Sequence, residues 1–137
     1  MIIPAVLIID DEESDRYLIK RMLRRGRICE QIIEARSGAD GVAYFEARDR
    51  QSTPIDTLIV LLDINMPRMN GLAFLEHFAS QQHRRGYQQV ICFMLSSSML
   101  PEEKQQAFQH PFVKGFIMKL PPDPQSLQRA LHAGLDG

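Results

Sequence analysis

Residues 58–63 read Leu-Ile-Val-Leu-Leu-Asp, an unbroken run of five aliphatic residues that ends in an acid. A strand that is apolar on both faces suits the interior of a parallel sheet that helices cover on both sides. Four more short apolar runs occur along the chain, at residues 6–9, 32–35, 90–95 and 116–118. Each is followed by a longer segment, so the chain is expected to alternate strand and helix five times in a doubly wound α/β fold.

The segments that follow the runs carry helix signals. We expect helices over about residues 14–25 and 39–50, and from about Gly71, Pro101 and Asp123 onward. The first carries Leu18, Met22 and Arg25 at i, i+4 and i+7 on one face, and the second carries Ala39, Val42 and Ala43 on one face. No linker separates these units, and 137 residues correspond to one domain.

Composition and charge exclude several classes of protein. Sixteen basic residues against seventeen acidic ones argue against a dedicated nucleic-acid binder. Two cysteines are too few for a disulfide scaffold, and the four histidines lack the spacing of zinc ligands. The N-terminal apolar stretch has no positive region before it, and no run is long enough to span a membrane. We therefore expect a reduced, cytoplasmic protein.

Candidate site residues follow four of the five expected strands, whereas Arg36, Ser37 and Gly38 after the second strand carry no obvious chemistry. In a doubly wound sheet the functional crevice lies at the carboxyl ends of the strands, so the candidate residues are expected to converge on one edge. They are Asp10, Asp11, Glu12 and Glu13 after the first strand, Asp63 after the third, Ser96 to Ser98 after the fourth, and Lys119 after the fifth.

This set of side chains suits phosphoryl transfer. Carboxylates that are brought together repel one another unless a cation neutralises them, and oxygen ligands favour Mg²⁺ or another hard ion. Lys119 would hold one phosphoryl oxygen as a point charge, and Ser96 would donate a hydrogen bond to another. The nucleophile would be a carboxylate, because no Ser-His or Cys-His pair is visible.

Each of these residues also has an ordinary structural explanation. Acids after a strand often cap the next helix, an Asp before a turn often forms an Asx-turn, and a Lys at a strand end is often solvated. The conjunction of Asp10, Asp11, Asp63, Ser96 and Lys119 at the same edge of the sheet favours the functional interpretation.

Four sequence blocks carry a resemblance to a known family. AVLIIDDEESDR (5–16), LLDINMPRMNG (61–71), FMLSSS (93–98) and GFIMK (115–119) resemble the receiver domain of bacterial two-component response regulators. The resemblance runs from about residue 6 to 135. It implies a single receiver domain over residues 1–137 of the stand-alone type. It also implies a flavodoxin-like, three-layer (βα)5 sandwich with a parallel sheet of strand order 2-1-3-4-5.

The resemblance also implies a metal-assisted phospho-acceptor. Asp63 would accept a phosphoryl group from a sensor histidine kinase or a histidine phosphotransfer protein. Asp11, Asp63 and the backbone carbonyl of Asn65 would bind Mg²⁺ directly, with Mn²⁺ as an alternative ion, and Asp10 would act through a bound water. Lys119 would pair with the acceptor and then with the phosphoryl group.

A conformational switch is implied in the same way. Ser96 matches the switch hydroxyl, Ser97 stands where the family has a small residue, and Phe116 matches the aromatic switch position. Met66, Pro67 and Gly71 match the loop after the acceptor. The surface made by the helix from Pro101, the strand 116–118 and the last helix would signal to a downstream protein target, or form a homodimer. No direct nucleic-acid contact, membrane insertion, enzyme activity on other molecules or effector domain is expected.

The sequence departs from the family's pattern after Lys119. The family has Lys-Pro with a cis bond, whereas this chain has Lys119-Leu120-Pro121-Pro122. A cis Lys119–Leu120 bond would cost about 3 kcal/mol, so the loop is expected to be either trans and rearranged or strained. Phe116 also lacks the hydroxyl of the commoner Tyr, which leaves packing alone to drive the ring.

Two alternative functions stay open on the sequence. One is a phosphorylation-independent binding module on the same fold. The other is a Mg²⁺-dependent phosphohydrolase with an aspartyl-phosphate intermediate, which usually has a second acid two residues after its nucleophile, where this chain has Asn65. A nucleotide or flavin binder is disfavoured because no Gly-rich loop follows the first strand.

Overall fold

The apolar runs form the strands of one sheet. The computed structural model describes residues 2–50, 57–85, 89–97, 99–119, 121 and 123–136. The strands are β1 (Ile3–Ile9), β2 (Cys29–Ala35), β3 (Leu58–Asp63), β4 (Val90–Ser96) and β5 (Val113–Met118). All of them pair in parallel in the order β2-β1-β3-β4-β5, which confirms the predicted fold class.

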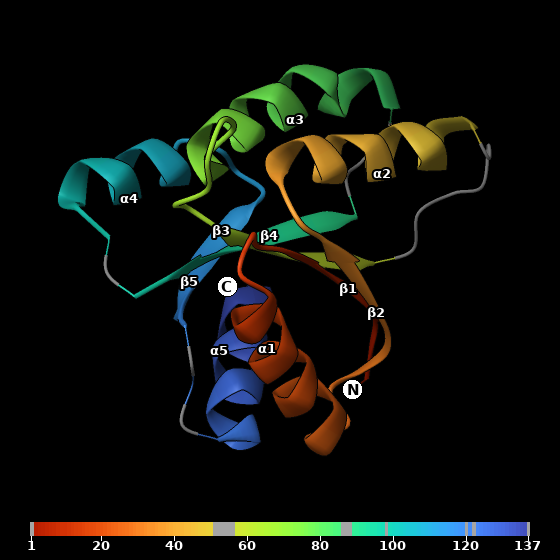
Figure 1. Ribbon diagram of the computed structural model, residues 1–137, viewed down its shortest axis with the longest axis vertical. Coiled ribbons are helices and arrows are strands. Elements are labelled where there is room, and N and C mark those ends of the chain that lie inside the picture. Colours follow the sequence, from red (N-terminus) through yellow and green to blue (C-terminus); the bar gives the residue numbers. More distant parts are fainter. Residues whose placement is uncertain are drawn as a thin grey trace.

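Helices cover the sheet on both faces. Helices α1 (Glu13–Arg25) and α5 (Pro124–Asp136) lie side by side on one face, as Figure 1 shows. The other face carries α2 (Gly38–Arg50), α3 (Gly71–Arg85) and α4 (Pro101–Phe108). This three-layer arrangement places the turns at the carboxyl ends of the strands along one edge of the sheet.

The central strand β3 explains why the sheet needs both layers. All of its residues are buried. Val60 and Leu62 belong to the core under α2, α3 and α4, whereas Ile59 and Leu61 belong to the core under α1 and α5. Successive side chains of a strand point to opposite faces, so a run that is apolar throughout stabilises the fold only between two helical layers.

β1, β2 and β5 begin earlier than their apolar runs. Ile3 pairs with Cys29 at the start of β1 and β2, and Cys92 pairs with Val113 at the start of β5. Because the ladder hydrogen bonds join backbone groups, polar residues such as Glu30 and Lys114 continue a strand whose outer side chains face solvent. The predicted runs therefore identified only part of these three strands.

The predicted face of α1 was wrong. Leu18 and Met22 are only half-buried and Arg25 is exposed. The fully buried apolar residues of this helix are Ile19 and Leu23, one residue further along. The helix begins at Glu13, and its orientation is set by the core that it shares with β1 and by its contacts with α5, which the spacing along the sequence does not include.

The predicted face of α2 was wrong as well. Ala39 and Ala43 are exposed, and Val42 is half-buried. Phe45 is buried instead, with its ring centroid 4.9 Å from that of Phe78 on α3. A phenylalanine ring removes more apolar surface from water than two alanine methyl groups, so it decides which side of the helix faces the sheet.

Some sequence predictions fall on residues outside the described ranges. Ser98, Leu120 and Pro122 are among them, so the conformation of the Lys119–Leu120 bond stays a prediction. The described residues contain no cis peptide bond. None of the helices in these ranges combines the length and apolarity that crossing a bilayer requires.

Candidate functional site

The strand register brings the predicted polar residues to one edge of the sheet. Ile9 is paired with Leu62, so Asp10 and Asp63, the next residues of the two strands, lie beside each other. On the other side of β3, Asp63 is paired with Leu95 of β4. The Lys119 backbone N–H donates to the Ser96 carbonyl at 3.1 Å, which fixes the start of the loop after β5.

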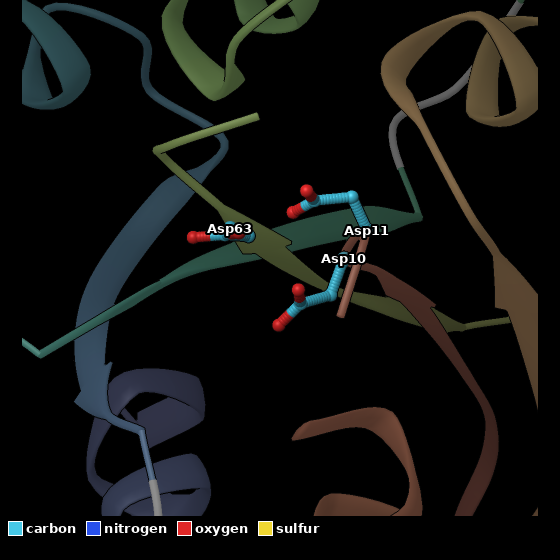
Figure 2. A group of neighbouring side chains, drawn as sticks. All are labelled: Asp10, Asp11 and Asp63. Atoms are coloured by element: carbon cyan, nitrogen blue, oxygen red, sulfur yellow. The ribbon is translucent and has the colours of Figure 1, made fainter. Parts of the chain in front are cut away.

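Three carboxylates meet at this edge. Asp10, Asp11 and Asp63 each offer an oxygen, and these oxygens lie within 4.8 Å of one another. Figure 2 shows the three side chains projecting from the ends of β1 and β3 toward the same space. Asp10 and Asp63 are buried, and Asp11 is half-buried. The predicted acidic cluster is therefore present as a spatial group.

Two of these carboxylates each accept one hydrogen bond from a backbone N–H. Oδ1 of Asp10 accepts from the Glu12 N–H at 2.9 Å, and Oδ1 of Asp63 accepts from the Asn65 N–H at 3.2 Å. Three other oxygens are buried and accept no hydrogen bond, namely Asp10 Oδ2, Asp11 Oδ1 and Asp63 Oδ2. Buried oxygens with unused lone pairs fit a hard divalent cation, which prefers carboxylate ligands.

The electrostatics of Asp63 reflect this crowding. Burial and the neighbouring charge of Asp10 raise the pKa of the Asp63 carboxyl to about 6. The Asn65 N–H and the Lys119 ammonium oppose the rise without cancelling it. Asp63 thus lies in an environment that disfavours its negative charge, and an added cation would relieve that cost.

Lys119, which follows β5, contacts two of the acids. Its Nζ lies 3.2 Å from Asp10 Oδ2 and 3.2 Å from Asp63 Oδ2. It also donates a 2.9 Å hydrogen bond to Oδ2 of Asp15, a residue of α1. Burial alone would lower the pKa of Lys119, but the hydrogen bond to Asp15 and the charges of Asp10 and Asp63 raise it above its usual range.

The two predicted serines lie in different surroundings. Ser96 is buried at the end of β4. Ser97 is exposed and lines the open pocket that Asp11, Asp63 and Lys119 also line. A phosphoryl oxygen in this pocket would meet polar groups from the ends of β1, β3, β4 and β5.

Phe116 does not reach the acidic pocket. Its ring is 47% exposed on the surface of β5 and lines a neighbouring pocket that Ser96 and Ser97 also border. The ring centroid lies 6.2 Å from that of Phe108 on α4, and Lys104 Nζ lies 4.5 Å from it. The aromatic position therefore faces outward in this structure.

The loop after β3 is tightly folded against the site. Met66 is buried, whereas Pro67 is exposed. The Gly71 N–H donates to the Ile64 carbonyl at 3.0 Å, and a Cβ at Gly71 would lie 2.5 Å from the Asp63 carbonyl oxygen. Only glycine lets the start of α3 approach the acceptor strand this closely.

Sequence reasoning missed two residues of the site. Asp15 contacts Lys119, and Arg16 contacts the Asp10 backbone, yet both stood in the sequence as unremarkable polar residues of a helix. Asp15 follows the acidic pair closely in the sequence and lies in the first turn of α1, but Asp11 precedes the helix, so no helical spacing relates the two residues. No local signal points to Arg16, because its partners lie on other elements.

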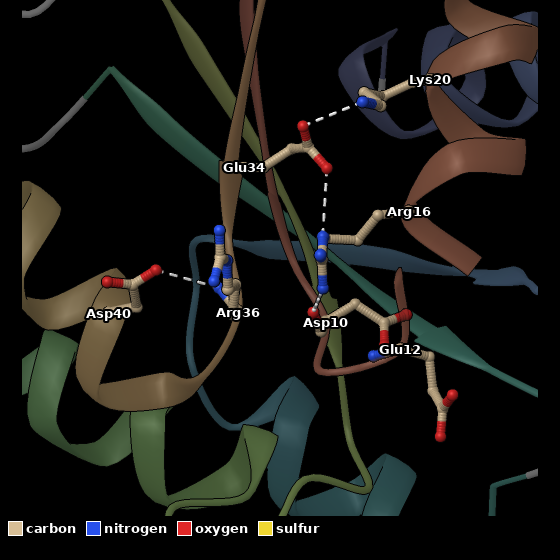
Figure 3. A network of polar contacts seen from close by, with 7 residues as sticks. All are labelled: Asp10, Glu12, Arg16, Lys20, Glu34, Arg36 and Asp40. Atoms are coloured by element: carbon tan, nitrogen blue, oxygen red, sulfur yellow. Dashed lines mark hydrogen bonds and ion pairs between the residues drawn. The ribbon is translucent and has the colours of Figure 1, made fainter. Parts of the chain in front are cut away.

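Arg16 belongs to a polar network behind the acids, which Figure 3 shows. Its Nη1 donates to the Asp10 carbonyl at 2.7 Å, and its Nε donates to Glu34 Oε1 on β2 at 3.0 Å. Lys20 Nζ donates to the second oxygen of Glu34 at 2.9 Å. Burial opposes the ionisation of Glu34, but these two donors lower its pKa.

A comparison with protein families agrees with this site. The family model of the response regulator receiver domain matches residues 6–132. The chain belongs to this family. Receiver domains are signalling phospho-acceptors of two-component systems and typically bind Mg²⁺ at an acidic pocket, and this receiver domain has the acidic group of Asp10, Asp11 and Asp63.

Curated relatives match this receiver domain at low identity. It is 26% identical over 133 residues to the nitrate/nitrite response regulator protein NarL of Escherichia coli (strain K12), which covers 97% of this chain and 55% of that protein. It is 33% identical over 75 residues to the chemotaxis protein CheY1 of Helicobacter pylori, and this match covers 55% of this chain and 55% of that protein. The chain thus spans about half the length of these relatives.

Solved structures match the whole receiver domain. A two component response regulator from Cytophaga hutchinsonii superposes with a TM-score of 0.82 at 25% identity, over 100% of both chains. The chemotaxis protein CheY4 of Vibrio cholerae superposes with a TM-score of 0.70 at 24% identity, over 95% of this chain and 97% of that one. At this identity, the match to CheY4 supports the fold alone.

Proposed function

We propose that this receiver domain accepts a phosphoryl group on Asp63 from a phosphohistidine of a sensor histidine kinase or a histidine phosphotransfer protein. The observation that carries the proposal is the state of the Asp63 carboxylate. One oxygen is held by the Asn65 N–H, and the other is buried, accepts no hydrogen bond and lies 3.2 Å from Lys119 Nζ. A carboxylate oxygen with unused lone pairs beside a cation is suited to attack phosphorus.

The transfer forms one bond and breaks one. An oxygen of Asp63 bonds to phosphorus while the phosphorus–nitrogen bond of the donor phosphohistidine breaks, and its electron pair goes to the imidazole nitrogen. Because the other ring nitrogen of the phosphohistidine carries a proton, the products are an acyl phosphate on Asp63 and a neutral histidine on the donor. Lys119 would stabilise the negative charge of the transferred phosphoryl oxygens, because its ammonium already lies beside the acceptor.

Mg²⁺ is the cofactor that the donor set supports, with Mn²⁺ as an alternative. Asp11, Asp63 and the backbone carbonyl of Asn65 would hold the ion, and Asp10 would act through a bound water. When bound, the ion neutralises the carboxylates and the phosphoryl oxygens. The buried oxygens without hydrogen bonds, which include Asp11 Oδ1, support this assignment.

Phosphorylation is proposed to act as a switch. The phosphoryl group adds about two negative charges and new acceptor oxygens beside Asp63. Ser96 and Lys119 would donate to those oxygens in the loaded state only, and Ser97 would border them. Phe116, which faces outward, would turn inward toward Ser96. Because these contacts differ between two states, phosphorylation shifts their populations.

The output surface is proposed to be formed by α4, β5 and α5. Four large apolar side chains are exposed at or next to α4 and β5, namely Leu100, Phe108, Phe116 and Met118. Exposed apolar side chains that gather on one surface favour a protein partner. We propose a downstream protein target there, or a second copy of the domain, and no contact with nucleic acid or insertion into a membrane. Residues 1–137 would act as one cytoplasmic receiver domain.

The test is the mass of the intact protein after incubation with acetyl phosphate, with and without Mg²⁺. Wild type is expected to gain one phosphoryl group that requires Mg²⁺, and Asp63→Asn is expected to gain none. Glu30→Gln, which removes an exposed acid of β2, is the matched control and should behave as wild type.

Two outcomes would replace the proposal. If wild type gains no adduct and takes up no beryllofluoride, the domain is a phosphorylation-independent binding module. If it releases many equivalents of inorganic phosphate without accumulating an adduct, it is a phosphohydrolase.

A further inference from the structure

Lys119 is shared between the acceptor and an acid that lies outside the group of Asp10, Asp11 and Asp63. Its Nζ donates a 2.9 Å hydrogen bond to Asp15 Oδ2, whereas Asp10 and Asp63 are each 3.2 Å away. The contacts to Asp10 Oδ2 and Asp63 Oδ2 are ion pairs, and the contact to Asp15 is the shortest of the three. The closest partner of the lysine is therefore the carboxylate of α1.

Asp15 faces the same space as the acceptor. It lines the pocket that Asp63, Asn65, Ser97 and Lys119 also line. It does not belong to the three-acid group of Asp10, Asp11 and Asp63 that suits a cation. A divalent ion held by those three acids would leave the charge of Asp15 facing the pocket, with Lys119 as its partner.

We propose that Asp15 is a positioning residue that competes with the acceptor for Lys119 and thereby weakens the phosphoryl-loaded state of this domain. This inference rests on the proposed function of Asp63. A phosphoryl group on Asp63 needs the lysine as a partner, so the lysine has to leave Asp15 or divide its hydrogens between two anions.

The effect of Asp15 has a definite sign. In the unloaded state its charge is compensated by Lys119, and the pair is favourable. In the loaded state its carboxylate competes for the lysine and repels the added negative charge. Only a difference in interaction between two states shifts their equilibrium, and both contributions of Asp15 favour the unloaded one.

The test is the affinity for beryllofluoride, a non-covalent phosphoryl mimic, measured by ¹⁹F NMR titration at saturating Mg²⁺. Asp15→Asn keeps an oxygen at the position and removes the charge. It is expected to bind about tenfold more tightly than wild type, the size of effect that one charge within a few ångströms produces in a partly buried site. Asp15→Ala removes the acceptor oxygen as well and should also bind more tightly than wild type.

The matched control is Glu13→Gln. Glu13 lies in the first turn of the same helix, is exposed and is not among the residues that line the pocket. The substitution changes the net charge by the same amount, so it should stay within about twofold of wild type, because exposed charges at a distance are screened. An increase in affinity for Asp15→Asn alone would assign the effect to the contact with Lys119.

Different failures have different meanings. If wild type binds beryllofluoride and Asp15→Asn binds equally or more weakly, Asp15 supports the lysine and the inference is wrong, while the function of Asp63 stands. Equal tightening by Glu13→Gln would also overturn it, because the effect would then be one of overall charge. If wild type binds no beryllofluoride under conditions in which it binds Mg²⁺, the proposed function itself fails.

Discussion

The guanidinium of Arg16 donates a 2.7 Å hydrogen bond to the backbone carbonyl of Asp10, from a position that is only 7% exposed. This bond ties the first turn of α1 to the strand end that carries the acidic pair. Arg16 also contacts Glu34 of β2, so the same side chain joins α1, the β1 end and β2. The arginine thus fixes the backbone on which the acids of the site stand.

Arg16→Ala is expected to weaken both the fold and the site. It leaves the Asp10 carbonyl without this donor, and the loss of a buried, charge-assisted hydrogen bond lowers the free energy of unfolding by about 2–3 kcal/mol. We also expect weaker Mg²⁺ binding, because Asp10 and Asp11 are held less firmly. Urea denaturation and a Mg²⁺ titration measure the two effects.

Lys20→Gln is the control for that experiment. It loses only the partly exposed ion pair with Glu34, so the change in unfolding free energy should stay below about 1 kcal/mol. An Arg16→Ala variant that resembles Lys20→Gln in both measurements would show that the bond to the Asp10 carbonyl does not hold the site.

Asp63→Asn is expected to stabilise the metal-free protein at neutral pH. The pKa of Asp63 is about 6 in the folded state and near 3.8 in the unfolded chain. Between these values the native state holds a proton that the unfolded state has released, so the free energy of unfolding falls as pH rises. Above pH 6 the full cost of ionising the buried Asp63 carboxyl is present, and the neutral amide avoids it, with a gain in unfolding free energy of at most about 3 kcal/mol.

Denaturation of both proteins in chelator at several pH values checks this expectation. The difference should be small below pH 4, grow between pH 4 and 6 and stay constant above. Glu30→Gln, an exposed acid of β2, should change stability by less than about 0.5 kcal/mol. A wild-type protein that is more stable than Asp63→Asn at pH 7 would mean that Lys119 outweighs burial at this carboxyl.

Mg²⁺ affinity is expected to fall as pH drops through 6. The ion binds the ionised carboxylate, so protonation of Asp63 competes with it. Below that pH the apparent dissociation constant should rise by about tenfold per pH unit, the slope of one competing proton. Calorimetric titrations at pH 5, 6 and 7 measure it, and a constant affinity over this range would contradict the raised pKa.

Gly71→Ala is expected to disturb the acceptor strand end. The new Cβ would lie 2.5 Å from the Asp63 carbonyl oxygen, which belongs to the backbone and has no flexible side chain to move. We expect a loss of about 2–4 kcal/mol and weakened Mg²⁺ binding, because the overlap displaces the residue that carries the acceptor.

Gly115→Ala on β5 separates steric overlap from loss of a glycine. Its Cβ would meet the Phe93 ring at 3.5 Å, an ordinary van der Waals contact. That variant should stay within about 1 kcal/mol of wild type in a urea melt. Equal effects of the two substitutions would refute the role assigned to the close approach at Gly71.

Sequence patterns predict the features of this protein that depend on local information. The run at residues 58–63 is apolar on both faces, and such a strand is stable only between two helical layers, so it predicts a covered parallel sheet. Once the sheet is parallel, the residues after its strands share an edge. The amino-acid sequence alone is therefore sufficient to group Asp10, Asp63 and Lys119.

The faces of the helices and the partners of the lysine are decided by tertiary packing. Leu18 and Ile19 are equally apolar neighbours in α1, yet only Ile19 is fully buried, because the rotation of the helix depends on what β1 and α5 present to it. Lys119 meets Asp15 across 104 positions of sequence. Contacts between elements so distant depend on strand register and helix orientation together, and no spacing within either segment records them.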